Sequence, residues 1–75
     1  MTSIDEQIKE LLARRDPNGY YIVPSDKSGI DIVKRFYSDV EFEEVGDIVF
    51  IKTRSRRVAE RIARILIQKG LIKSM

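Results

Sequence analysis

The segment from Val40 to Ile51 constrains the fold most, because its pattern is that of a β-hairpin. Its first four residues alternate between apolar and acidic side chains, which predicts a strand with one buried face. Gly46 and Asp47 can take the positive φ angles of a two-residue turn. Residues 48–51 are all apolar, so we expect them to form a strand that is buried on both faces and central in its sheet.

The first helix is expected to run from Ile4 to Arg15. Ser3 and Glu6 form a capping-box pattern at its start, and apolar residues recur behind them at helical spacing. The turn-forming sequence at 16–19, which contains a proline and a glycine, then ends the helix.

A strand and a second helix are expected next. Aromatic and β-branched residues predict a short strand from Tyr20 to Val23, and Pro24 is expected to end it. The second helix is predicted from Gly29 to Ser38, with either Ser25 or Ser28 as its N-cap. Its buried face is expected to consist of Ile30, Val33, Phe36 and Tyr37.

The last helix is predicted from Arg56 to Lys69, with Ser55 as its N-cap. Gly70 and Leu71 resemble a left-handed C-cap and its hydrophobic contact. The predicted order of elements is therefore α-β-α-β-β-α. We expect a single α+β domain over residues 1–75, a three-stranded sheet with helices packed mainly on one face.

The composition limits the chemistry of the chain. It has no cysteine and no histidine, which removes thiolates, the commonest general base and the commonest metal ligand. We find no catalytic, metal-binding or cofactor-binding motif and expect a protein that is not an enzyme. No apolar run approaches the length of a membrane span, and residues 1–6 lack a signal-peptide core, so a cytoplasmic location is expected. Eleven isoleucines and only three side-chain amides are typical of thermophilic proteins.

The charges are divided unequally along the chain. Residues 52–75 hold eight basic side chains and a single acidic one, Glu60. Residues 1–51 hold six basic and eleven acidic side chains, so the formal net charge of +2 conceals two oppositely charged segments. This division indicates a polyanionic partner, a complementary protein surface or self-association.

The basic segment is expected to form one surface on the last helix. Arg57, Arg61 and Arg64 recur at helical spacing, and the cations near Ser55 lie where a helix already carries partial positive charge. A phosphate would relieve this repulsion, and arginine suits forked contacts to it. We therefore hypothesise a nucleic-acid-binding protein, for DNA or RNA, that grips the phosphate backbone. The candidate residues are Lys52, Arg54, Ser55, Arg56, Arg57, Arg61 and Arg64.

Two alternatives remain open for this surface. In one alternative, the arginines of the last helix pair within the molecule with acidic residues of the N-terminal half, such as Glu41, Glu43 and Glu44. In the other alternative, the chain is a protein-interaction module, either a homodimer or a partner of an acidic protein surface. Tyr20 and Tyr21 also have two interpretations, as stacking platforms for unpaired bases or, favoured here, as core residues.

Residues 51–59, with the sequence Ile-Lys-Thr-Arg-Ser-Arg-Arg-Val-Ala, resemble the basic strand-to-helix loop of archaeal Alba-type chromatin proteins. The resemblance is confined to this loop, and the predicted order of elements departs from theirs. It therefore transfers no role to any residue.

Overall fold

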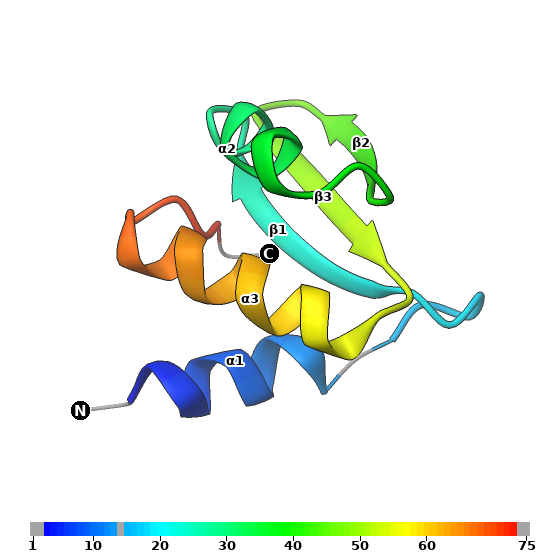
Figure 1. The fold of residues 1–75 in the computed structure, drawn as a ribbon, viewed down its shortest axis with the longest axis vertical. Coiled ribbons are helices and arrows are strands. Elements are labelled where there is room, and N and C mark those ends of the chain that lie inside the picture. Colours follow the sequence, from blue (N-terminus) through cyan, green and yellow to red (C-terminus); the bar gives the residue numbers. More distant parts are fainter. Residues whose placement is uncertain (1–2, 14, 74–75) are drawn as a thin grey trace.

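The computed structural model describes residues 3–13 and 15–73, which form one sheet and three helices (Figure 1). The predicted α+β class and the order α-β-α-β-β-α are both confirmed. The elements are α1 (Ile4–Leu12), β1 (Tyr21–Asp26), α2 (Gly29–Phe36), β2 (Glu41–Val45), β3 (Ile48–Thr53) and α3 (Arg56–Gln68). Within this described part of the chain, no helix is both long enough and apolar enough to cross a membrane.

The sheet has the order β1-β3-β2, with both pairs antiparallel, so β3 is central as predicted. The two-residue turn joins β2 to β3, and Val45 pairs with Ile48 across it. Gly46 has a φ of +61°, whereas no residue other than glycine has a positive φ among those described. The expectation of positive φ at both turn residues is therefore wrong for Asp47, and the turn needs only its glycine, as type II′ turns do.

The helices cover one face of the sheet. In β3 the covered face carries Val49, Ile51 and Thr53, all buried. Across the strand register, Tyr21, Val23 and Ser25 of β1 share this face. Figure 1 shows α3 beside β1 and α1 on the far side of α3, running in the opposite direction. The core is completed by Ile8, Leu12, Val33, Ala59, Ile62, Ala63 and Leu66.

In the described part of the chain, no helix packs against the other face of the sheet. It carries Ile48, Phe50 and Lys52 of β3, which are only half-buried, so the prediction that β3 is buried on both faces is wrong. In the paired strands, the side chains on this face include Ile22 of β1 and Val45 of β2. Because the three helices pack on one face, the second face of β3 stays in partial contact with solvent, although four consecutive residues of the strand are apolar.

The helix α1 is shorter than expected. Ser3 Oγ accepts a hydrogen bond from the Glu6 N–H at 3.2 Å, as the capping box predicts. The helix ends at Leu12, however, and Arg15 forms an isolated antiparallel bridge with Tyr21. Arg15 cannot remain helical, because its backbone is extended against the edge of β1. Arg14, which the sequence also predicts to be helical, lies outside the described residues.

The strand β1 continues through Pro24, contrary to the prediction that proline ends it. Pro24 is tolerated because β1 is an edge strand of the sheet and the missing N–H faces away from β3. The Pro24 carbonyl accepts a hydrogen bond from the Lys73 N–H at 3.1 Å. The Asp26 N–H donates to the Leu71 carbonyl at 2.8 Å, so the segment after α3 covers this end of β1.

The helix α2 begins at Gly29 as predicted but ends at Phe36, since Tyr37 is already extended. Ser28 occupies the N-cap position without a side-chain capping bond, and Ser25 is fully buried in β1. The carboxylate of Asp26 accepts hydrogen bonds from the Ser28 N–H and hydroxyl instead, at 3.0 and 2.7 Å. Val33 is buried, but Phe36 is 66% exposed, which contradicts its predicted place in the core.

The helix α3 ends in the predicted cap. Gly70 has a φ of +70°, a left-handed value that suits glycine. The Leu71 N–H donates to the Leu66 carbonyl at 2.8 Å, the long bond of a Schellman motif.

Candidate nucleic-acid interface

Two side-chain hydroxyls fix the start of α3. Ser55 Oγ accepts a hydrogen bond from the Val58 N–H at 3.2 Å, which confirms Ser55 as the N-cap. Thr53 Oγ1, which is buried, accepts one from the Ser55 N–H at 3.2 Å. The junction between β3 and α3 is thereby held in place, and it presents Arg54 at the surface.

Arg54 rests on an aromatic ring. Its Cζ lies 4.8 Å from the centroid of the Tyr20 ring, a cation–π geometry. Tyr20 is half-buried, so the ring is anchored while the guanidinium stays exposed. From the sequence, Tyr20 was interpreted as either a base-stacking or a core residue. Its contact with Arg54 was not predicted, because the two residues are 34 positions apart in the sequence.

Arg57 and Arg61 stand one helical turn apart on α3, and both are exposed. Neither has a carboxylate oxygen within 4.0 Å among the described residues. The first turn of α3 contains no acidic residue. Both charges are therefore exposed and without an ion-pair partner in the described part of the chain.

Arg56 and Arg64 do have acidic partners. Arg56 Nε lies 3.0 Å from Glu60 Oε1, one turn along α3, and this hydrogen bond raises the pKa of Arg56, with a further contribution from the Tyr21 hydroxyl. Arg64 Nη2 lies 2.7 Å from Asp5 Oδ1 of α1, and both side chains are at least half exposed. The partners belong to α3 itself and to α1.

Lys52 lies apart from the arginines of α3. Its side chain is on the helix-free face of the sheet, where Nζ is 3.0 Å from Glu43 Oε1 and only 21% of the side chain is exposed. Hydrogen bonding to Glu43 raises the pKa of Lys52. The structure thus brings the six predicted residues from Arg54 to Arg64 to one helix and its junction, and separates Lys52 from them.

The carboxylates of β2 do not neutralise α3. Among the described residues, Glu43 forms its ion pair with Lys52, and no ion pair joins an arginine of α3 to Glu41 or Glu44. The strand β2 lies on the far side of β3 from β1, and its glutamates are exposed. The alternative of intramolecular pairing with the N-terminal half therefore holds for Arg64, whose partner is Asp5, but not with Glu41, Glu43 or Glu44. Arg56 pairs with Glu60 of its own helix.

The two tyrosines differ. Tyr21 is 4% exposed and belongs to the core, as favoured from the sequence. The guanidinium of Arg15 lies over its ring, 4.7 Å from the centroid, and donates to its hydroxyl. Tyr21 is therefore closed to any base, whereas Tyr20 is covered by Arg54.

A small hollow of about 270 Å³ adjoins the start of α3, and sequence reasoning missed it. It is lined by Phe36, Tyr37, Ser38, Asp39, Val40, Thr53, Ser55 and Val58. One side of the hollow consists of the last residue of α2 and the segment after it, which leaves the helix at the extended Tyr37. The only signal in the sequence was the aromatic pair at the end of the predicted helix.

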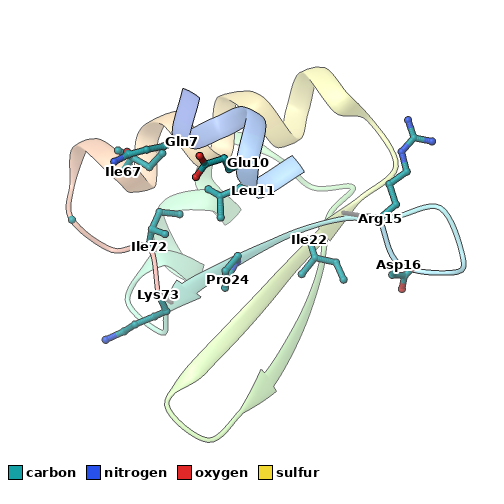
Figure 2. Close-up of a pocket in the computed structure, with 11 residues that line it drawn as sticks. Gln7, Glu10, Leu11, Arg15, Asp16, Ile22, Pro24, Ile67, Ile72 and Lys73 are labelled. Carbon is teal, nitrogen blue, oxygen red and sulfur yellow. The ribbon is translucent and has the colours of Figure 1, made fainter. Parts of the chain in front are cut away.

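A larger groove of about 720 Å³ lies elsewhere, between α1, β1 and the segment after α3 (Figure 2). Leu11 points from α1 toward β1, and Ile22, Pro24, Ile67 and Ile72 supply further apolar walls. Charged residues, among them Glu10 and Lys73, also line it. None of the predicted site residues lines this groove.

Comparisons with models of protein families, with curated proteins and with solved structures found no match for the chain. Within residues 3–13 and 15–73, no cluster of three or more acidic side chains is placed to hold a metal ion.

Proposed function

We propose that the protein is a small, non-enzymatic nucleic-acid-binding domain that holds a phosphate backbone, of DNA or RNA, along α3. The observation that carries this proposal is the pair Arg57 and Arg61. They are exposed, one turn apart, and have no carboxylate within 4.0 Å among the described residues. Uncompensated cations on a rigid helix attract a polyanion and release its counterions.

The junction adds a third contact. Arg54 is held on the Tyr20 ring, which lowers the conformational entropy that it must lose on binding. A guanidinium fixed in this way keeps its forked donors free for a phosphate. Arg54, Arg57 and Arg61 form the core of the proposed interface.

Arg56 and Arg64 take a secondary role in this proposal. Their carboxylate partners, Glu60 and Asp5, are exposed, and exposed ion pairs are weak. Each arginine can exchange its carboxylate for a phosphate at little cost. Lys52 stays with Glu43 on the other face of the sheet and makes no contact with the bound strand.

The test is fluorescence anisotropy with labelled DNA and RNA at about 50 and about 200 mM salt. Binding should weaken steeply with salt, and the double variant Arg57→Ala/Arg61→Ala should flatten the log–log slope by about 2. Lys9→Ala/Lys27→Ala removes the same charge at two exposed lysines outside α3, and it should keep nearly the slope of the wild type. The proposal is overturned if the wild type does not bind at the lower salt concentration. It is also overturned if the salt slope falls equally in both double variants.

A second function is favoured by the helix-free face of the sheet. Phe50, Ile48 and Ile22 are half-buried there, Val45 is 53% exposed, and the larger groove reaches the same face at Ile22. The same face carries Lys52, Glu43 and Glu41, so its apolar part is bordered by charged side chains, as in protein interfaces. Two copies joined through it would form a homodimer that leaves both α3 helices exposed, either for nucleic acid or for an acidic protein surface.

Light scattering tests this second function. A dimer should show twice the 8.7 kDa mass of the chain, and Phe50→Glu should return it to the mass of one chain. Val45→Thr changes the same face conservatively and should leave the dimer intact. A single-chain mass for the wild type at high concentration would exclude the dimer.

A further inference from the structure

Phe36 is the most exposed large apolar side chain described in the molecule, at 66%. It stands three residues after the buried Val33, at helical spacing, and yet it does not join the core. The chain leaves the helix at Tyr37, whose backbone is extended, with φ −137° and ψ 126°. Phe36 is instead one of the residues that line the small hollow beside the start of α3.

The hollow has the chemistry of a site for a planar, polar ring. Phe36 and Tyr37 provide aromatic surface, and Val40 and Val58 provide apolar contact. Hydroxyls of Ser38, Thr53 and Ser55 and the carboxylate of Asp39 provide polar atoms on the same walls. Mostly apolar walls with a few polar groups are what small-molecule and base sites present.

Asp39 argues against a phosphate in the hollow, because a carboxylate repels an anion. It suits the donor groups on the edge of a nucleobase, such as an exocyclic amine. The hollow and the arginines therefore favour different parts of a nucleotide, the base and the phosphate.

The two features adjoin each other. Thr53 and Ser55, which line the hollow, flank Arg54 in the chain, and Val58 follows Arg57. A nucleotide with its base in the hollow would therefore have its backbone near the junction and first turn of α3, which carry Arg54 and Arg57. Charge complementarity thus selects a nucleotide as the occupant.

We infer that this hollow receives an unpaired nucleobase stacked on Phe36, so that the ligand of the interface is single-stranded DNA or RNA. The inference rests on the proposed function and specifies its substrate class. The bases of a duplex are stacked and paired, and they cannot enter a hollow beside the backbone without being flipped out.

The experiment compares a single-stranded oligonucleotide with its duplex at one salt concentration. The wild type should bind the single strand more tightly. Phe36→Ala should weaken single-strand binding by about 5- to 150-fold, the effect of losing one stacked base, and leave duplex binding and the salt slope unchanged. Phe36→Trp should restore it. Val45→Ala, at the other exposed apolar side chain, is the matched control and should bind as the wild type does.

A second readout reports the base itself. A 2-aminopurine placed in the single strand should lose fluorescence on binding to the wild type, because the base stacks, and should not do so with Phe36→Ala. If Phe36→Ala binds and quenches as the wild type does while Arg57→Ala/Arg61→Ala fails to bind, the inference is overturned and the proposed function stands. If neither the wild type nor any variant binds nucleic acid at low salt, the proposed function itself fails.

Discussion

The guanidinium of Arg54 lies over the ring of Tyr20, with Cζ 4.8 Å from the ring centroid. This contact joins the chain before β1 to the junction between β3 and α3. An exposed cation–π pair is worth about 0.5–1 kcal/mol. A double-mutant cycle with Arg54→Ala and Tyr20→Leu, measured by urea unfolding, should give a coupling of about this size.

Variants of Tyr20 also test the role of this contact in nucleic-acid binding. Tyr20→Phe keeps the ring and should preserve both the coupling and the affinity for nucleic acid. Tyr20→Leu removes the ring, and Arg54 then loses its support, so affinity should fall with little change in the salt slope, since no charge is lost. A coupling near zero would mean that Arg54 does not rest on the ring in solution.

Arg64 and Asp5 are 59 residues apart in the sequence, and their side chains meet at 2.7 Å. Exposed pairs of this kind contribute about 0.2–1 kcal/mol and are screened by salt. Asp5→Asn should therefore destabilise the fold by no more than about 1 kcal/mol, and the loss should vanish at about 1 M salt.

Asp5→Asn should have the opposite effect on ligand binding. It removes a carboxylate that competes with phosphate for Arg64, so affinity for nucleic acid should rise. Glu6→Gln, an exposed acidic neighbour without an ion pair among those described, is the control for net charge. An equal rise in affinity in both variants would mean that net charge, and not the Asp5–Arg64 ion pair, causes the effect.

Much of the fold was predictable because local signals agreed. The alternation in β2, the glycine turn and the apolar run of β3 all predict one hairpin, and both helix caps at Ser3 and Ser55 formed as their patterns indicate. Gly70 likewise ended α3. Each of these features depends on residues within a few positions of one another.

The errors arose where a distant segment decided the outcome. Pro24 remains in β1 because β1 is an edge strand, and Phe36 is exposed at the residue where α2 ends. The partner of Arg64 belongs to another helix, so no local pattern could identify it. Helical spacing was enough to predict which basic residues share α3. Which of them have an ion-pair partner, and where the small hollow lies, depend on tertiary packing.

Gly29 packs so closely against β1 that it has no room for a side chain. A Cβ there would collide with Ser25 Oγ and lie 3.0 Å from Leu66 Cδ2. Since Ser25 is fully buried, Gly29→Ala should destabilise the fold by about 1–3 kcal/mol, as overpacking does. Urea unfolding measures this loss.

Ser25→Ala removes the colliding oxygen and should recover part of that stability in the double variant. The two changes should therefore be less than additive. Gly46→Ala serves as a comparison without a steric clash, because nothing lies within 4 Å of the added Cβ. Its loss of stability comes only from the φ of +61°. Full additivity of Gly29→Ala and Ser25→Ala would refute the steric explanation.

Asp26 links the end of β1 to the start of α2. The Ser28 N–H and then the Ser28 hydroxyl lower the pKa of Asp26 below its ordinary value of 3.8, and Lys73, at 3.6 Å, adds to the effect. A carboxyl whose pKa is lower in the folded state stabilises the fold above about pH 4 and loses this contribution as the pH falls through its folded pKa. Asp26→Asn should thus be less stable than the wild type at neutral pH, and the difference should shrink in acid.

Two measurements check this. The urea midpoint of Asp26→Asn and of the wild type should converge as the pH falls below about 4, and the carboxyl carbon of Asp26 should titrate below the value of an unstructured peptide. Ser28→Ala should move this titration upward, because the hydroxyl is a cause of the shift, whereas Lys27→Ala, at the exposed neighbour, should not. Parallel midpoint curves that never converge in acid would show that the ionised carboxylate is not what stabilises this corner of the fold.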